Sequence, residues 1–459
     1  MENLEKIYII GIEGAGTSAL ALMYKELGYD VSGSDDGDHF YGDVLAEKGI
    51  KVFDGYSADN LPQNVSKVIY STAIKENNPE LVEATKRNFK KVTYPEALAE
   101  LFNKKIGVAI CGTHGKTTTT ALLAFVLNKL NLQPSAIVGS KVLNWSGNSL
   151  VGKGDYFVIE ADEYQNKLRY YNPWSVILTG VDYDHPDFYK NFADYKKVFA
   201  DFVKKIPGHG FLFYCNDDCD VVEISKLATC QKFSYGSSKN SDYEIRNEKI
   251  LTTEKEILQT FEVFNKNKLL GKFKIKILGR HNVLNATAVI AFCHNLNLDL
   301  KKIAEALNEF SGTARRFQYL GKSKGAILID DYAHHPEEIK ATLRTAKSIY
   351  GDKEIIVVFH PHSFTRTEAL LDDFAQSFGD CSKVIVLDIY GSARENSGKV
   401  NSRDLVEKIN QYYFGKAEYV PTIEEATKFL QKRIDKNQVI ISIGAGDVWR
   451  VTKRLAENR

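Results

Sequence analysis

Short apolar runs and stretches with helical periodicity alternate along the chain and predict an α/β protein. Runs rich in Ile and Val, such as residues 106–111 and 355–359, have the length of buried strands. Residues 18–27 and 120–130 instead repeat apolar positions at helical spacing. Because the two patterns alternate, we expect mostly parallel sheets that are covered by helices.

The pattern divides the chain into three successive α/β segments, residues 1–105, 106–310 and 311–459. A length of 459 residues is also in keeping with about three domains. Within the central segment, residues 211–278 alternate apolar and polar positions, and Gly, Asn and Asp separate the short runs. This stretch predicts a small antiparallel insert in an otherwise parallel domain.

Composition narrows the possible functions. A formal net charge of +1 gives no reason to expect binding to nucleic acid or to a membrane surface. No run approaches 18 apolar residues, and the first residues lack the pattern of a secretion signal. Six scattered cysteines fit a reducing compartment, and the spacing of Cys215, Cys219 and Cys230 near His209 matches no common zinc pattern. We expect a cytoplasmic protein, monomeric or a weak homodimer.

Residues 106–120 read IGVAICGTHGKTTTT and carry the most specific signal. A strand, a glycine-rich turn and a helix follow one another, which is the arrangement of a P-loop in its shorter form, GTHGKT. The glycines let backbone N–H groups converge on a phosphate, Lys116 supplies a cation, and the Thr117 hydroxyl can ligate Mg²⁺. The alternative is a plain glycine-rich turn with a solvated lysine. We expect ATP to contact Gly112, Thr113, His114, Gly115, Lys116, Thr117 and Thr118.

A second strand–turn–helix unit opens the chain. The strand at residues 6–10 is followed by Gly11, Gly14 and Gly16, and Asp35 ends the next strand. The order G-x-x-G-x-G differs from the dinucleotide fingerprint, so NAD is only weakly indicated. We expect a nucleotide diphosphate on Gly14, Ala15, Gly16 and Thr17, with a hydroxyl-bearing ring near Asp35 and with Ser71 at a ligand-facing strand end; the alternative is a structural βαβ turn.

Carboxylates and a histidine follow two further strands of the central segment. Glu160 to Glu163 come directly after residues 156–159, and Asp182 to His185 follow residues 176–181. Oxygen ligands of this kind beside a P-loop suit a Mg²⁺–nucleotide site, whereas the alternative is a charged loop. Later, Asn282 with His281 opens a helix: an Asn amide can pair with adenine and a ring can stack on it, or the Asn can simply cap the helix.

Four strands of the last segment end in polar residues at one edge of the expected sheet. These strand ends bring Asp331, His362, Asp388 and Asp447, with Arg366 close by. At the join with the central segment, Arg315 and Arg316 could reach across to phosphate, or could be a solvated surface pair.

Taken in order, these motifs resemble the Mur ligase family of peptidoglycan biosynthesis over nearly the whole chain. They are GTHGKTTTT (112–120), EADE (160–163), DYDH (182–185), GRHNVLNA (279–286), ARRFQ (314–318), DDYAHHP (330–336), PHSFTRT (361–367) and GAGD (444–447). The resemblance implies a Rossmann-like UDP-binding domain, residues 1–105, a central ATP-binding domain, residues 106–310, and a C-terminal Rossmann-like lid, residues 311–459.

The resemblance also implies a reaction. The lactyl carboxylate of UDP-N-acetylmuramate attacks the γ-phosphate of ATP, and the amine of L-alanine then displaces phosphate from the acyl phosphate. By resemblance, one Mg²⁺ lies on Thr117 and Glu160 and a second on His185. The resemblance also implies that the adenine of ATP contacts His281 and Asn282, that its ribose contacts Asp331 and that Arg316 contacts phosphate. It further implies that the UDP diphosphate contacts Gly14 to Thr17, with Asp35 nearer the uridine, and that alanine approaches His362 and Arg366.

Some positions depart from the family pattern. Glu13 and Thr17 replace the usual Gly and Met of the first loop, and the lid has His360-Pro361-His362-Ser363 in place of Gln-Pro-His-Arg. Related ligases carbamylate a lysine to hold the second Mg²⁺, and Lys196 or Lys197 could have that role. The EADEY sequence also resembles a sibling that adds a murein tripeptide to the same sugar nucleotide, and a non-catalytic nucleotide-binding protein is a further alternative.

Overall fold

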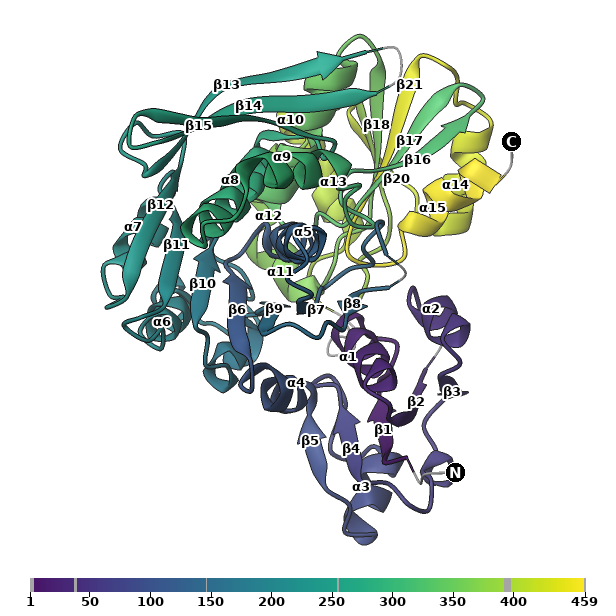
Figure 1. Cartoon of the computed structure of the whole chain (residues 1–459). Coiled ribbons are helices and arrows are strands. Elements are labelled where there is room, and N and C mark those ends of the chain that lie inside the picture. The colour runs from purple at the N-terminus through teal and green to yellow at the C-terminus, as the bar shows by residue number, and fades with distance from the viewer. Residues whose placement is uncertain (1–3, 37–38, 146, 254–255, 392–397, 458–459) are drawn as a thin grey trace.

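The computed structural model describes residues 4–36, 39–145, 147–253, 256–391 and 398–457, and it contains three sheets that follow one another along the chain (Figure 1). The mixed α/β architecture predicted from the alternation of strand and helix patterns is confirmed. In the described part of the chain, no helix combines the length and the apolar run needed to cross a membrane.

The first sheet is fully parallel and has the order β3-β2-β1-β4-β5. Its direction of winding reverses between β1 and β4, so a crevice forms at the carboxyl ends of these two strands, where Gly11 and Ser71 lie. Its elements are β1 (Lys6–Ile10), α1 (Ala15–Glu26), β2 (Asp30–Asp35), α2 (Gly42–Glu47), β3 (Lys51–Asp54), β4 (Lys67–Tyr70), α3 (Pro79–Lys86), β5 (Lys91–Thr93) and α4 (Tyr94–Phe102).

The central sheet has ten strands in the order β15-β14-β13-β12-β11-β10-β6-β9-β7-β8. Strand β6 lies between β10 and β9, and both neighbours run parallel to it. Its elements before the antiparallel arm are β6 (Ile106–Cys111), α5 (Lys116–Lys129), β7 (Ser135–Ile137), β8 (Ser149–Leu150), β9 (Tyr156–Glu160), the 3-10 segment η2 (Tyr164–Tyr170), β10 (Ser175–Leu178), α6 (Phe192–Val203), β11 (Phe211–Cys215), α7 (Cys219–Ser225) and β12 (Gln231–Gly236).

The antiparallel part is narrower than residues 211–278. Strands β11 and β12 run parallel to their neighbours with α7 between them. Within the described residues of this stretch, the antiparallel pairs are those of β13 (Tyr243–Thr252), β14 (Ile257–Asn265) and β15 (Lys268–Ile275), and the short pair of β7 and β8 lies outside it. These three strands extend the same sheet as a long arm (Figure 1). The outermost strand, β15, exposes Lys268, Lys272 and Lys274. Helices α8 (Arg280–Asn295) and α9 (Leu300–Glu309) complete the domain.

The last sheet has the order β16-β17-β21-β18-β19-β20, and all its pairs except β16–β17 are parallel. Its elements are β16 (Gln318–Ser323), β17 (Ala326–Asp331), α10 (Pro336–Tyr350), β18 (Glu354–Phe359), α11 (Phe364–Ala369), α12 (Leu371–Gln376), β19 (Lys383–Val386), α13 (Ser402–Tyr412), β20 (Ala417–Tyr419), α14 (Ile423–Gln431), β21 (Gln438–Ile443) and α15 (Trp449–Glu457).

The hydrophobic cores separate the last domain from the other two. One buried cluster runs without a break from the first domain, through α1, into the central sheet. The last domain has two clusters of its own, one on each face of its sheet. No buried hydrophobic cluster of the described residues joins the last domain to the other two.

Candidate active site

A cleft of about 500 Å³ lies where the carboxyl ends of strands from all three sheets face one another. The first domain contributes the turn after β1, the central domain the turns after β6, β9 and β10, and the last domain the turns after β17, β19 and β21. Of the predicted site residues, those lining this cleft are Gly14, Ala15, Gly16, Thr17, Ser71, Thr113, Gly115, Lys116, Thr117, Glu160, His185 and Arg316.

The turn after β6 has the backbone of a phosphate-binding loop. Gly112 has a φ of 128°, and a Cβ at this position would lie 2.4 Å from the Thr179 hydroxyl. Gly115, at φ 79°, caps α5, which begins at Lys116 rather than at residue 120. The free N–H groups at the start of this helix therefore lie beside the lysine, and Thr118, in the same first turn, is buried.

Lys116 is held in place by its own loop and by one carboxylate. Its Nζ donates to the carbonyl oxygens of Gly112 and Thr113 at 2.5 and 3.0 Å, and to Glu163 Oε2 at 3.0 Å. Burial alone would lower the pKa of Lys116, but the neighbouring carboxylates, above all Glu163, raise it. The lysine is therefore a fixed cation at the mouth of the loop.

Thr117 and Glu160 form one oxygen-rich group. The Thr117 hydroxyl donates to Glu160 Oε1 at 2.9 Å, and the Gly139 N–H donates to Glu160 Oε2 at 2.7 Å. Arg316 approaches from the last domain, with Nη2 3.4 Å from the same hydroxyl. Hydroxyl and carboxylate oxygens of this kind suit Mg²⁺. Burial raises the pKa of Glu160, and a divalent cation would favour its ionised form.

Asp162, Glu163 and His185 form a second group whose potential ligand atoms all lie within 4.8 Å of one another. His185 Nε2 is 3.6 Å from Glu163 Oε1, which also accepts a hydrogen bond from the Tyr195 hydroxyl. Burial lowers the pKa of His185, but Asp184 and Glu163 raise it overall. Two hard carboxylate ligands fit Mg²⁺, and the imidazole would have to be neutral to join them.

His114 is not among the described residues that line the cleft, and it joins two domains. Its Nδ1 lies 3.1 Å from Glu338 Oε1 of the last domain, and its Nε2 lies 3.2 Å from Asp182 Oδ2. Although burial opposes the charge, hydrogen bonds to Asp182 and Glu338 raise the pKa of His114 to about 10. The residue is therefore an imidazolium that ties the phosphate-type loop to α10.

His281 and Asn282 lie behind the loop, and neither is among the described residues that line the cleft. Gly279, at φ 106°, occupies the N-cap of α8, and the Asn282 amide instead donates to the Leu278 carbonyl at 2.7 Å. Burial, with the charge of Arg316, lowers the pKa of His281 to about 4. The N-cap alternative for Asn282 is therefore wrong, and the adenine contacts stay predictions.

The two arginines at the start of the last domain diverge. Arg315 is buried and donates to the Gly444 and Gly446 carbonyls at 2.6 and 2.9 Å, whereas Arg316 faces Thr117. Left-handed backbone at Arg315 and Phe317, with φ of 59° and 48°, turns the intervening side chain towards the cleft. The alternative of a solvated pair is wrong, because Arg315 is 6% exposed.

Asp331 closes the same turn. Its two carboxylate oxygens accept from the backbone N–H groups of Phe317 and Ala333, each at 2.8 Å. Burial raises the pKa of Asp331 to about 6. The carboxylate thus braces the junction, and a ribose contact would have to share these oxygens.

His362 lies on the turn after β18 and Arg366 in the first turn of α11, and neither is among the described residues that line the cleft. Both Arg366 Nε and Nη2 bond Asp184 Oδ1 of the central domain, at 3.0 and 2.9 Å. His362 stacks on Tyr390, with 5.6 Å between ring centroids, and burial together with Arg366 lowers its pKa to about 3. Tyr390 follows β19 at one of the predicted polar strand ends and lines the cleft, but it is not among the predicted site residues.

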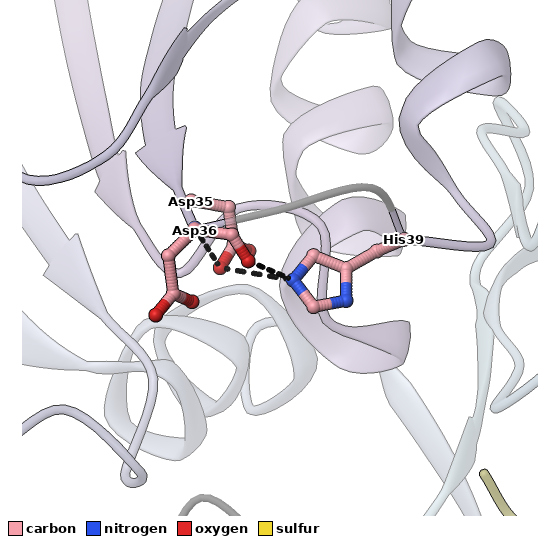
Figure 2. A group of neighbouring side chains, drawn as sticks. All are labelled: Asp35, Asp36 and His39. Atoms are coloured by element: carbon pink, nitrogen blue, oxygen red, sulfur yellow. Dashed lines mark hydrogen bonds and ion pairs between the residues drawn. The ribbon is translucent and has the colours of Figure 1, made fainter. Parts of the chain in front are cut away.

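The turn after β1 is braced from β2. The Glu13 N–H donates to Asp35 Oδ2 at 2.7 Å, and the Tyr56 hydroxyl donates to Asp35 Oδ1 at 3.1 Å. Figure 2 shows His39 reaching back to Asp35 and Asp36: its Nε2 is 2.7 Å from the Asp36 carbonyl oxygen and 3.6 Å from Asp35 Oδ1. Asp35, Tyr56 and Ser71 line a second cavity of about 580 Å³ next to the cleft.

Other predicted features lie elsewhere. Lys196 pairs with Asp220 and Glu223 and Lys197 with Asp201, so neither lysine lines the cleft. Cys215 and Cys230 are buried and Cys219 is exposed, and the described residues do not gather them with His209 into a metal-ligand group. Across the mouth of the cleft, the rings of Phe40 and Trp449 meet edge to face at 5.4 Å, so the first and last domains touch directly.

Three protein-family models match the chain in succession. The catalytic domain of the Mur ligase family matches residues 6–106, the Mur ligase middle domain residues 110–293, and the Mur ligase glutamate ligase domain residues 315–446. Together they span nearly all of the sequence.

Similar proteins agree with these matches. The chain is 37% identical over 450 residues to the UDP-N-acetylmuramate–L-alanine ligase of Carboxydothermus hydrogenoformans, covering 98% of this chain and 96% of that one. The crystal structure of the UDP-N-acetylmuramate-alanine ligase of Thermotoga maritima has a TM-score of 0.84 at 30% identity and covers 98% of both chains. A murein peptide ligase of Psychrobacter arcticus shares the fold, with a TM-score of 0.75 at 23% identity and 99% of both chains covered.

The family predicted from the ordered motifs is confirmed by these matches, and it accounts for three α/β domains around one cleft. By sequence and by structure, this chain belongs to the Mur ligase family.

Proposed function

We propose that the chain joins L-alanine to the lactyl carboxylate of UDP-N-acetylmuramate at the expense of ATP, a step in making the peptidoglycan precursor. The observation that carries this proposal is that a single cleft is lined both by the loop around Lys116 and by the diphosphate-type turn at Gly14 to Thr17. A triphosphate on the first and a sugar nucleotide on the second would bring the γ-phosphate and the lactyl group together between them.

The central domain would activate the carboxylate. Lys116 and the N-terminus of α5 would hold the outer phosphates, so that a carboxylate oxygen can bond to the γ-phosphorus while the bond to ADP breaks. Thr117 with Glu160, and Asp162 with Glu163 and His185, are the residues that would hold Mg²⁺, which would reduce the repulsion between the two anions. Arg316, at the junction with the last domain, would add positive charge where phosphate is transferred.

The last domain would complete the second step. The amine nitrogen of L-alanine bonds to the acyl carbon, and phosphate leaves as the amide forms. The acyl phosphate reacts readily with water, so the domain must stay closed over it. The Arg366–Asp184 and His114–Glu338 pairs hold the domain against the centre, and we assign the amino-acid end of the cleft to the turn that carries His362 and Arg366.

The remaining partners follow from the same proposal. The second cavity, beside Asp35 and Ser71, is the place we assign to the uridine. The protein would act in the cytoplasm as a monomer or weak homodimer, without nucleic acid or membrane.

The test is the mass of the product. The protein is incubated with UDP-N-acetylmuramate, ATP and Mg²⁺, together with either L-alanine or the murein tripeptide. We expect an L-alanyl product, ADP and phosphate in equal amounts. Product with the tripeptide but none with L-alanine would replace this function by that of the sibling ligase, and no product with either would refute ligation.

A further inference from the structure

Lys167 has no part in the reaction as described above, yet its side chain lines the cleft. It lies in η2, four residues after Glu163, and its side chain is only 13% exposed. Its Nζ bonds Asp162 Oδ2 at 2.5 Å and lies 5.4 Å from the centre of the Tyr164 ring. The lysine is therefore directed inwards, towards a carboxylate of the second oxygen-rich group.

A strained turn places this lysine. Gln165 and Asn166, which precede it, are both left-handed, with φ of 56° and 54°. Such a backbone costs roughly 1–2 kcal/mol for Gln165 and less for Asn166, because Asn tolerates the left-handed region better than most residues. The turn is pinned because the Asn166 N–H donates to the Tyr189 hydroxyl at 3.1 Å, which donates to the Glu163 carbonyl at 2.5 Å. Strain that is held in this way at a cleft indicates a functional constraint on the side chain that it directs.

Most lysine and arginine side chains of the cleft are already held away from the turn of the first domain. Lys116 is held in its own loop, Arg315 by backbone carbonyls, and Arg316 lies near Thr117. In contrast, the first turn of α1 reads AGTS and has no basic residue, and Glu13 adds a negative charge beside it. Among the described basic side chains that line this cleft, Lys167 is the remaining lysine or arginine; His39 lines both the cleft and the neighbouring cavity, which Lys75 also lines.

Tyr94 brings this lysine close to the start of α1. A Cβ on Gly16 would lie 2.6 Å from Tyr94 Cζ, so the Tyr94 ring covers the first turn of the helix. Burial raises the pKa of Tyr94, and the negative charges of Glu160 and Asp162 raise it further. Asp162, Lys167 bound to it, Tyr94 and the diphosphate-type turn all line the same cleft.

We propose that Lys167 is a positioning residue for the sugar nucleotide: its ammonium group leaves Asp162 to bind an anion of that substrate, either the diphosphate or the lactyl carboxylate. Asp162 is then free to join Glu163 and His185 around a divalent cation, so the sugar nucleotide strengthens metal binding. This inference rests on the proposed function, because it takes the substrate from it.

Binding measurements test the exchange. Calorimetry compares wild type, Lys167→Met and Lys167→Arg with three ligands: UDP-N-acetylmuramate, UDP-N-acetylglucosamine, which lacks the lactyl group, and UDP. We expect Lys167→Met to bind UDP-N-acetylmuramate roughly tenfold to a hundredfold more weakly, as for loss of a charged hydrogen bond, and Lys167→Arg to recover most of the affinity. The control, Lys196→Met, removes a lysine that is paired outside the cleft and should bind like wild type.

The three ligands separate the two anions. If Lys167→Met binds UDP as well as UDP-N-acetylmuramate more weakly than wild type does, Lys167 contacts the diphosphate. If only the affinity for UDP-N-acetylmuramate falls, Lys167 contacts the lactyl carboxylate. Titration with Mn²⁺, followed by its electron paramagnetic resonance signal, gives a second readout. Without nucleotide, Lys167→Met should bind Mn²⁺ more tightly than wild type, and the sugar nucleotide should tighten Mn²⁺ binding in wild type alone.

Unchanged affinities for the nucleotides in Lys167→Met would overturn the inference. Thermal melting of each variant shows whether it is folded, and Lys167→Gln serves in place of the Met variant if that one is not. A wild type that binds none of the three nucleotides would instead refute the proposed function. A wild type that binds them no better than Lys167→Met would refute only the role of Lys167.

Discussion

Two turns of this molecule have the same plan, a strand followed by glycines and a helix, but their charges differ. The turn between β6 and α5 has two left-handed glycines, and the helix begins with Lys116. The turn between β1 and α1 begins its helix at Ala15 and has no basic residue in the first turn. The comparison teaches that strand–turn–helix spacing indicates where a phosphate can bind, whereas the source of its counter-charge depends on tertiary contacts.

The largest effect should come from removing the cation that belongs to the central turn. We expect Lys116→Ala to lower the rate of ADP formation at least a hundredfold, because a fixed positive charge at the transferred phosphate is lost. The control, Lys129→Ala, removes an exposed lysine at the far end of α5 that pairs with Glu309, and should keep the wild-type rate. A folded Lys116→Ala protein with a rate close to that of wild type would show that this turn does not bind the reacting phosphate.

An effect of intermediate size, on the free energy of unfolding, should distinguish the backbone conformations of the two turns. Gly115 has a φ of 79°, and a Cβ there would lie 2.6 Å from Asn285 Oδ1, so Gly115→Ala adds both strain and a clash. We expect it to lower the free energy of unfolding by about 2 kcal/mol.

Gly14→Ala is the matched variant in the other turn. Gly14 is extended, at φ −62°, and its Cβ would crowd the Thr17 hydroxyl, at 2.9 Å, and lie at an ordinary 3.6 Å from the Gly11 carbonyl oxygen. Urea unfolding of both variants should show a clearly smaller loss for Gly14→Ala. Equal losses would mean that the two N-cap glycines do not differ in backbone strain.

The third effect concerns pH. His114, on the central turn, has its pKa raised to about 10 by Asp182 and Glu338, above the value of about 6.5 for an unfolded chain. The stability it contributes should therefore be fully present below about pH 6.5 and be lost as the pH rises towards 10. Denaturant unfolding of wild type and His114→Gln at pH 6 and pH 9.5 should show a larger difference at the lower pH. A difference that is independent of pH would contradict the ion pairs.

Local pattern was enough to predict much of the fold. The run from residue 106 to 111 is β6, and the four polar strand ends of the last domain do meet at one edge of a parallel sheet. The start of α5 could not be placed from periodicity, because the residues from Lys116 to Thr120 are polar yet the threonines are all buried. Likewise, β11 and β12 share the short apolar runs of an antiparallel insert but pair in parallel, since a helix connects them.

The site was less predictable where one backbone angle or one distant partner decides the outcome. Arg315 and Arg316 are neighbours in the sequence, but left-handed residues send them to different places. Lys167 looks like any lysine on a polar turn, and only the tertiary structure shows that it faces Asp162. The roles of individual site residues therefore stay predictions that the variants above can test.

The arm that ends in β15 has a consequence for the protein at high concentration. An unpaired outer strand offers its N–H and C=O groups to any other extended segment and can start sheet-to-sheet aggregation. Here Lys268, Lys272 and Lys274 project from that strand into solvent. A second copy that added a strand alongside would have to bring its own three ammonium groups up against these, so the ten-stranded sheet should not grow from one molecule into the next.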